Sequence, residues 1–571
     1  MGRHAQLSST DGCVLLGWGL LFVAMACSVG FITLADFSTI ASNLPDDASY
    51  YFQIAKNIAE GHGSTFDRIN PTNGYQPLWL LVLSGVFCVI KGTPETLTRV
   101  ALVLQAGMLF LGGWIFFRIQ KTLFPPIIAL LSMVVYVFAV FFRGTNGMES
   151  AILIFTLIVL YDCGYRWKII ETPDRRKEFV FGLVLGLVML ARMDMLFLGV
   201  CVTAASLMPG CVARKHIAAS VARTIAIVGG ASLVVAPYLI YNYLAFGHIA
   251  PISAALKSSF PHLVGFSELY PNAKSGVGHS IQKTFVYACF LFAVFYCVYF
   301  AGKWRLLRRN EDGRLFYYGA TAVFSGAIVF HYLHACLFIK FGNFGWHYTP
   351  YGLFFALAVC GPAFRLLSRV PKMQLVVAPL LGALILAGGI VTYRQQYTKK
   401  NDWLLAAYRA GIWARDHTDK NDIFALMDTG HFCFFSERRV INLDGLVNSW
   451  EYQEALREQK GVEYLKSKGV GYFVSHRVRD IGVLDNHYDW LSFRMGSWLY
   501  NVSPNIMWLN KTWEFHRCER FEAPTPPGWN QFIIWKLDWN LEMKWRDEKS
   551  KSQDGRTRRS RPPRGETAPV A

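Results

Sequence analysis

Charged residues are scarce in this chain of 571 residues: they make up 17% of it, against about 25% in an average soluble protein. No CxxC pair occurs among its 12 cysteines, which removes the usual signatures of structural zinc sites and thioredoxin-like centres. There is also no Walker loop, HExxH or DxD motif, so ATP-driven transport, zincin proteolysis and metal-bound nucleotide-sugar chemistry lose their usual signatures. Aromatic residues do not interleave with the basic clusters, and we therefore expect no nucleic-acid partner.

Apolar residues are correspondingly abundant. Hydrophobic residues make up 53% of the chain and aromatic residues 15%, with a mean hydropathy of +0.27. Long apolar runs lie at 13–35, 76–90, 100–117, 124–142, 150–162, 179–208, 218–246, 284–300, 316–339, 351–364 and 374–392. This pattern predicts a polytopic α-helical membrane protein.

Two of these runs decide the number of crossings. As a helix, 76–90 reaches only about 22 Å against a hydrocarbon core of roughly 30 Å, so we expect a juxtamembrane helix. Run 179–208 is read as two short helices hinged near Arg192–Asp194. These choices predict about eleven transmembrane helices.

The basic residues orient this arrangement. Lys and Arg concentrate in the loops 118–123, 163–178, 209–217, 301–315 and 364–373, and are sparse in the segments 36–98, 143–149, 190–197, 247–282 and 341–350. The positive-inside rule therefore predicts a multi-pass protein of the cell inner or plasma membrane, with its N-terminus inside and its C-terminus outside.

The chain divides into three parts. We expect a transmembrane module over 1–393, with the first outer loop at 36–98, and an extracytoplasmic α/β domain over 394–540, where "IFALMDTG" and "RRVINLDG" resemble strands ending in turns. The basic tail 541–571 lacks apolar periodicity and is predicted to be disordered.

The first outer loop opens on "NLPDDASYYFQIAKNIAEGHG". From Asp47 onward the pattern predicts an amphipathic helix lying on the membrane surface, with Tyr51 on its apolar face and Gly61 at its end. Acids at a helix start are ordinary caps, but one cap explains only one member of the pair Asp46 and Asp47. The other is a candidate functional carboxylate.

Other polar residues near the outer ends of the spans are candidates too. In "NGYQPLW" these are Asn73, Tyr75 and Gln76, although a rigid turn with an aromatic anchor also accounts for that motif. The remaining candidates are Glu149 in "GMES", Arg192 and Asp194 in "LARMD", Lys257 and His347. Glu149 as an N-cap and Arg192–Asp194 as a structural pair are the simpler alternatives.

Together these motifs resemble the GT-C membrane glycosyltransferases, among which mycobacterial arabinofuranosyltransferases are the most similar; protein O-mannosyltransferases and the lipid A aminoarabinose transferase belong to the same class. The resemblance covers roughly residues 13–390. It implies an inverting transfer of a single sugar, a hexose or a pentose, from a polyprenyl-phosphate donor to an extracytoplasmic glycan, lipid or protein acceptor.

The resemblance also implies roles for individual residues. The acid after the first span is the catalytic base of this class, so the base here is Asp46 or Asp47, and we favour Asp46. A carboxylate suits this role because it takes the proton of the acceptor hydroxyl. Arg192 and Lys257 are the candidates for the donor phosphate. A divalent metal held by Asp47, Glu149 and His347 is left open, and no other cofactor is expected.

Two rival functions share this topology. A lipid-linked sugar flippase needs ionisable groups spread through the membrane midplane, whereas here they cluster at the outer ends of the spans. An oligosaccharide ligase or polymerase depends on outer Arg and His more than on an acid after the first span.

Overall fold

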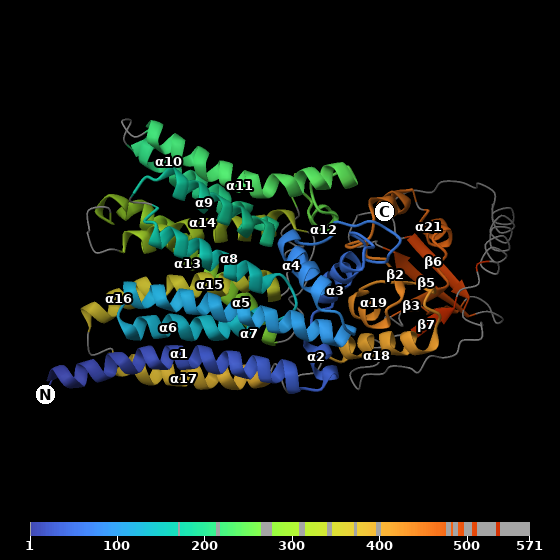
Figure 1. Cartoon of the computed structure of the whole chain (residues 1–571), viewed down its shortest axis with the longest axis horizontal. Coiled ribbons are helices and arrows are strands. Elements are labelled where there is room, and N and C mark those ends of the chain that lie inside the picture. Colours follow the sequence, from blue (N-terminus) through green and yellow to red (C-terminus); the bar gives the residue numbers. More distant parts are fainter. Residues whose placement is uncertain are drawn as a thin grey trace, which may run out of the picture.

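The computed structural model is mainly helical. It describes residues 2–169, 172–212, 217–263, 277–307, 314–339, 345–370, 374–394, 401–458, 460–475, 481–483, 489–495, 505–510, 533–536 and 539. The predicted disordered tail 541–571 lies outside the described residues. A bundle of long helices makes up one end of the molecule, and a smaller α/β part lies at the other (Figure 1).

The bundle contains helices that are long and apolar enough to cross a membrane. Among the described residues there are six of them, at 11–34, 94–123, 126–144, 217–246, 315–338 and 345–369. They fall in α1 (Gly2–Leu34), α5 (Pro94–Leu123), α6 (Pro126–Tyr136) with η1 (Val137–Phe141) and α7 (Phe142–Gly144), α11 (Ile217–Phe246), α14 (Leu315–Phe338), and η4 (Gly345–Tyr348) with α15 (Thr349–Ala358) and α16 (Cys360–Arg369). The chain is therefore a multi-pass membrane protein, while the number of eleven crossings and their orientation remain predictions.

Other helices of the bundle are shorter or less uniformly apolar. They are α8 (Ser150–Arg166), α9 (Arg175–Ala191), α10 (Leu196–Val212), α13 (Val277–Leu307) and α17 (Gln374–Tyr393). The predicted hinge is confirmed, because α9 ends at Ala191 and the short turn η2 (Met193–Met195) separates it from α10. This turn holds Asp194 at the end of the bundle that faces the first outer loop.

The first outer loop forms α2 (Phe37–Asn43), α3 (Asp46–Ala59) and α4 (Pro77–Val89). Pro45 precedes α3, both Asp46 and Asp47 lie in its first turn, where negative charge favours the helix dipole, and Gly61 follows its end with a φ of +85°. The short helix α4 is about 20 Å long, as expected of a segment that does not cross.

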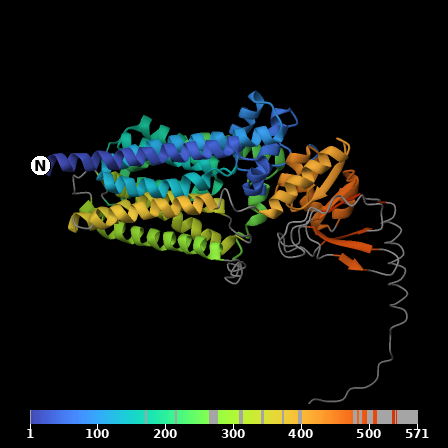
Figure 2. The ribbon, with the colours of Figure 1, turned by 90° about the horizontal axis from the view of Figure 1, so that it is seen from below.

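The expectation that α3 lies on a membrane surface is wrong. Its polar residues Gln53 and Asn57 are buried as completely as its apolar ones, because α4 covers one side and the C-terminal part covers another (Figure 2). Asn57 donates to the carbonyl oxygens of Thr65 and Phe66 at 2.8 and 3.0 Å, so this face satisfies its polar groups with protein. An amphipathic pattern fits a polar protein interface as well as a membrane surface.

The C-terminal part combines short helices with two small sheets. Its helices are α18 (Asp402–His417), α19 (Gly430–Ser436), α20 (Trp450–Arg457) and α21 (Gly461–Ser467), and α12 (Ile252–Lys257) from the transmembrane part lies near them. Its strands are β1 (Ile423–Leu426), β2 (Arg439–Asn442), β3 (Tyr472–Ser475), β4 (Ile481–Val483), β5 (Asp489–Met495), β6 (Asn505–Asn510) and β7 (Ile533–Lys536).

The larger sheet has the order β2-β1-β3-β7. Strands β2 and β3 run parallel to β1, and β7 runs antiparallel to β3. The second sheet is the antiparallel ladder β4-β5-β6. Ligand sites of parallel sheets lie beyond the carboxyl ends of the strands, and here the segments that follow β1 and β2 contact α3 and the first outer loop.

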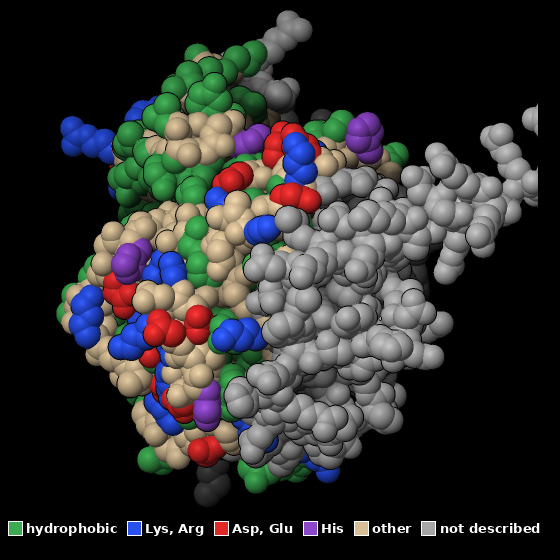
Figure 3. All heavy atoms as spheres, turned by 90° about the vertical axis from the view of Figure 1, so that its right-hand side faces the viewer, with side chains coloured by type: hydrophobic (Ala, Val, Ile, Leu, Met, Phe, Trp, Pro, Cys, Tyr) green, Lys and Arg blue, Asp and Glu red, His purple; other side chains and the backbone are tan. Residues whose placement is uncertain are grey.

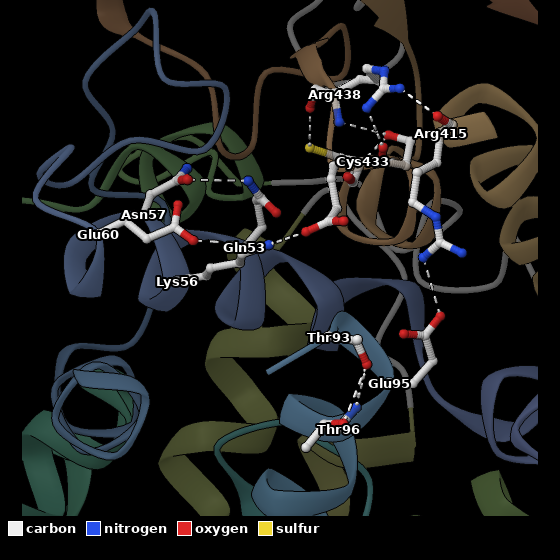
Figure 4. Close-up of polar contacts among 12 residues, drawn as sticks. Gln53, Lys56, Asn57, Glu60, Thr93, Glu95, Thr96, Arg415, Cys433 and Arg438 are labelled. Carbon is white, nitrogen blue, oxygen red and sulfur yellow. Dashed lines mark hydrogen bonds and ion pairs between the residues drawn. The ribbon is translucent and has the colours of Figure 1, made fainter. Parts of the chain in front are cut away.

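The two parts of the chain are joined by charged and aromatic contacts. Lys56 on α3 is paired with Glu437, and Arg415 Nη1 lies 3.5 Å from Glu95 Oε1 at the start of α5 (Figure 4). Phe52 packs against Phe434, with ring centroids 5.6 Å apart.

The outer face of the C-terminal part carries charges of both signs, whereas hydrophobic side chains gather toward the top of the view, where Figure 1 places α11 (Figure 3).

Candidate functional site

A cavity of about 70 Å³ lies where the bundle, the first outer loop and the C-terminal part meet. It is lined by Asp47, Tyr50, Tyr51, Gly74, Tyr75, Gln76, Met148, Glu149, Ser253, Lys257, Trp346, His347, Leu446 and Val447. These residues come from segments far apart in the sequence. The cavity is therefore formed by the ends of several elements and by the loops next to them.

The cavity brings together most of the residues singled out in the sequence. Seven of them line it, namely Asp47, Tyr51, Tyr75, Gln76, Glu149, Lys257 and His347. The other four lie outside its lining: Arg192 contacts the lining residues Glu149 and His347, Asn73 holds α12, Asp46 binds α19, and Asp194 pairs with Arg192 and lies 3.0 Å from His331. The structure thus places all eleven candidates around one region.

Asp47 presents its carboxylate to the cavity from the first turn of α3. Among the residues that the structure describes, none hydrogen-bonds this carboxylate. Burial raises the pKa of Asp47 to about 7; the nearby Lys257 lowers it, and the charges of Asp46, Asp444 and Asp428 raise it further. A carboxyl group with such a pKa exchanges a proton readily near neutral pH.

Asp46 is engaged in a different way. Its Oδ2 accepts the backbone N–H of Gly430 at 2.8 Å, and its Oδ1 accepts that of His431 at 2.7 Å. These donors are the first two amides of α19, so Asp46 caps a helix of the C-terminal part and not its own helix. A Cβ at Gly430 would lie 2.1 Å from the Asp46 carbonyl oxygen, which explains the glycine. Asp46 is buried and joins the two parts of the chain.

Tyr51 ties three segments of the site together. Its hydroxyl donates to Glu149 Oε2 at 3.0 Å and accepts the backbone N–H of Gln76 at 3.2 Å. The side chain of Gln76 in turn accepts the backbone N–H of Met193 at 3.0 Å, in the turn between α9 and α10. This chain of bonds fixes the position of Glu149, the residue that precedes α8, relative to α3 and α4.

Arg192 lies behind the lining and is only 2% exposed. It pairs with Asp194, its Nε lies 3.9 Å from Glu149 Oε1, and its Nη1 donates to the backbone oxygen of His347 at 3.2 Å. His331 Nε2 completes this cluster at 3.0 Å from Asp194 Oδ2. The structural pairing weighed for Arg192 and Asp194 is therefore present, and Arg192 supports two lining residues from behind.

Asn73 positions the helix that carries Lys257. Its Oδ1 accepts the backbone N–H of Ile252 at 3.0 Å, at the first turn of α12. Ser253 and Lys257 on this helix both line the cavity. Asn73 therefore acts on the cavity through α12.

Several residues of the site were missed in the sequence. Tyr50 lies one turn after Asp47 and shares its helix face, a spacing that predicts a common location. His331 stands inside an apolar run, where ionisable groups are rare and signal a special role. Leu446 and Val447 carry no chemical signal, because they reach the cavity only through the docking of the C-terminal part.

The candidate metal ligands do not form a metal site. In the described part of the chain, no group of three or more His, Cys, Asp or Glu side chains is arranged to hold a metal ion. Glu149 instead accepts the Tyr51 hydroxyl and faces Arg192. We derive no step through a metal at this cavity.

Comparison with known protein families gives a match over the C-terminal part of the chain. A family described as "Domain of unknown function (DUF8728)" matches residues 389–532. A comparison with curated protein sequences gives no match.

Comparison with solved structures gives similar folds. The archaeal oligosaccharyltransferase AglB from Archaeoglobus fulgidus, in complex with an inhibitory peptide and a dolichol-phosphate, is 13% identical, with a TM-score of 0.46 over 81% of this chain and 69% of that one. ArnT from Cupriavidus metallidurans, bound to undecaprenyl phosphate, is 13% identical, with a TM-score of 0.44 over 80% of this chain and 93% of that one. The similarity to these two structures is one of fold. At TM-scores below 0.5 it carries no inference about activity.

Proposed function

We propose that this protein is a membrane glycosyltransferase that moves one sugar from a polyprenyl-phosphate donor to the hydroxyl group of an acceptor. The observation that carries the proposal is the environment of Asp47. Its carboxylate faces a cavity at the end of a membrane-spanning bundle, beside Lys257 and without a hydrogen-bond donor among the described residues. A general base and a cation at one cavity suit the transfer of a sugar from a phosphate.

The proposed reaction is a single displacement. Asp47 takes the proton of the acceptor hydroxyl, and the oxygen forms its bond to the anomeric carbon from the side opposite the phosphate. The bond between that carbon and the phosphate oxygen breaks, and its electron pair leaves with the polyprenyl phosphate. Lys257 stabilises the phosphate charge, and the configuration at the sugar is inverted. The proton on Asp47 then returns to water.

The geometry favours Asp47 over Asp46 as the base. Asp46 is held by two amides of α19, at 2.7 and 2.8 Å, and its removal would leave those donors without their acceptor. A general base must lie within hydrogen-bond reach of a substrate hydroxyl. Of the two carboxylates, only Asp47 lines the cavity. Asp46 is assigned to the docking of the C-terminal part.

Lys257 is the stronger candidate for the donor phosphate. It lines the cavity, whereas Arg192 lies behind Glu149 and His347 and is paired with Asp194. A cavity of about 70 Å³ holds about two water molecules at liquid density. We therefore expect the walls to move apart when a sugar enters.

The test uses the full-length protein in lipid nanodiscs with farnesyl-phosphate-linked mannose, arabinofuranose and glucose, together with octyl glycosides as acceptors. We expect transfer by the wild type and a loss of about 10²–10⁴-fold in kcat for Asp47→Asn, the range of a general base. Asp46→Asn is the matched control, and we expect it to lose much less of kcat than Asp47→Asn in the fraction that is folded.

Two outcomes would contradict the proposal. If Asp47→Asn retains full turnover of a donor that the wild type uses, Asp47 is not the base. If none of these donors is turned over while a fluorescent lipid-linked sugar crosses the membrane of proteoliposomes that contain the same protein, the protein is a flippase. Transfer of a whole oligosaccharide from a diphosphate donor would instead identify a ligase or polymerase.

A further inference from the structure

Asp444 lies just beyond β2 and gathers backbone and side-chain donors around one buried carboxylate. Its Oδ2 accepts the Tyr50 hydroxyl at 3.3 Å, Asn442 Nδ2 at 2.9 Å and the backbone N–H of Asp428 at 3.1 Å. Its Oδ1 accepts the backbone N–H of Leu446 at 2.9 Å. One side chain therefore fixes the segments that follow both β1 and β2.

Tyr50 is the link from this carboxylate to the cavity. Its hydroxyl donates to Asp444 and also accepts the backbone N–H of Thr429 at 3.3 Å. Its ring lines the cavity one turn of α3 beyond Asp47. The side chain thus contacts the C-terminal part at one end and the site at the other.

The segment that Asp444 holds is itself a wall of the cavity. Leu446 and Val447 line it, and they are the lining residues that come from the C-terminal part among those described. The backbone of this segment packs so closely on Gly74 that a Cβ there would lie 1.9 Å from the Leu446 carbonyl oxygen. The wall therefore has no room to shift toward the first outer loop.

We propose that Asp444 and Tyr50 form a positioning pair through which the C-terminal part completes the active site and shapes its acceptor side. This inference rests on the proposed role of Asp47. A donor with a lipid tail approaches from the membrane-spanning bundle, whereas the wall of Leu446 and Val447 belongs to the C-terminal part and packs on α12, the helix that carries Lys257. The carboxyl ends of parallel strands, where this wall lies, are the usual place for a ligand in such sheets.

The charge of Asp444 also reaches Asp47. The charged and titratable groups around Asp47 are Asp46, Tyr50 and Tyr51 on its own helix, Lys257 on α12, Asp428 and Asp444 from the C-terminal part, and Tyr75, Glu149 and His347 in the cavity lining. Among them, Asp444 raises the pKa of Asp47. Removing this charge therefore lowers the pKa of Asp47, which a purely structural role does not require.

The test compares full-length wild type, Asp444→Asn, Asp444→Glu and Tyr50→Phe in nanodiscs. The control is Tyr464→Phe, which removes another hydroxyl at the same interface: Tyr464 donates to Asn70 Oδ1 at 2.9 Å and does not line the cavity. Labelling of Asp47 by dicyclohexylcarbodiimide, which reacts with protonated carboxyl groups, is followed against pH by peptide mass spectrometry. Hydrogen exchange is measured on peptides that cover 427–431 and 443–448.

We expect the midpoint of Asp47 labelling to shift to lower pH in Asp444→Asn and to stay near the wild-type value in Asp444→Glu, which keeps the charge. Exchange in both peptides is faster in Asp444→Asn, and exchange in 427–431 is faster in Tyr50→Phe. Tyr464→Phe leaves the midpoint and the peptide 427–431 unchanged; the peptide 443–448 is not compared for this control, because the Tyr464 hydroxyl also lies 3.3 Å from Asn448 Oδ1.

The inference is overturned if Asp444→Asn matches the wild type in midpoint and exchange, or if Tyr464→Phe has the same effect as Tyr50→Phe. It is also overturned if Asp444→Glu shifts the midpoint as far as Asp444→Asn. Turnover of Asp47→Asn is measured in the same preparations. Retained turnover there contradicts the proposed function alone, because the labelling and exchange results do not depend on a substrate.

Discussion

The carboxylates of Asp46 and Asp47 are adjacent in sequence and have opposite surroundings. Asp46 accepts two backbone amides of α19 and is held within the interface between the two parts of the chain. Asp47 faces a cavity beside Lys257, and its pKa is raised to about 7. Consecutive residues in the first turn of a helix point in different directions, which separates a structural from a chemical role within one pair.

Replacing Asp46 is expected to weaken the docking of the C-terminal part. In Asp46→Asn one amide of α19 loses its charged acceptor, which costs about 1.5–3 kcal/mol for a bond to a charged group. We expect a lower unfolding temperature in nanodiscs, measured by intrinsic fluorescence. The control Asp36→Asn alters a similar cap, of α2, at an exposed position and has a smaller effect. Equal unfolding temperatures for the two variants would contradict this role.

The activity is expected to depend on pH through Asp47. The base works only when deprotonated, so turnover rises with pH around a pKa of about 7 and levels off above it. Because Lys257 lowers this pKa, Lys257→Gln moves the rise to higher pH and also raises the KM for the donor. The control Lys56→Gln removes a cation that pairs with Glu437 and leaves the rise in place. A rise that stays fixed or moves to lower pH in Lys257→Gln is the contrary result.

The sequence predicted the transmembrane half of the site better than its outer wall. Asp47 stood out as an acid that a single helix cap does not explain, and Glu149 and Lys257 as polar residues at the outer ends of the spans, and all three line the cavity. Leu446 is an ordinary apolar residue, and its place in the cavity depends on contacts between segments hundreds of residues apart. The burial of α3 was missed for the same reason, since periodicity does not identify what covers a polar face.

Removing the buried cation behind the cavity is expected to destabilise the protein. Arg192→Met leaves the buried Glu149 and the partly exposed Asp194 without their guanidinium partner, and breaking a buried ion pair from one side costs about 3–5 kcal/mol. The double variant Arg192→Met/Asp194→Asn removes one of the two carboxylate charges that have lost their guanidinium partner, and it recovers part of the lost stability. Thermal unfolding in nanodiscs measures both variants. A double variant less stable than Arg192→Met would show that the cluster is not held by this pairing.

A methyl group at Gly74 is expected to separate the outer wall from the first outer loop. Its Cβ would lie 1.9 Å from the Leu446 carbonyl oxygen and 3.1 Å from Val447 Cα. Both are backbone atoms, which cannot move aside as the end of a flexible side chain can. Gly74→Ala therefore pushes the Leu446 segment away from the cavity, with faster hydrogen exchange over 443–448 and reduced turnover. The matched control is Gly85→Ala on α4, where a Cβ has no heavy atom within 4 Å and alanine favours the helix. If Gly74→Ala exchanges and turns over like this control, the wall is not held by close packing on Gly74, and the C-terminal part reaches the site only through Asp444 and Tyr50.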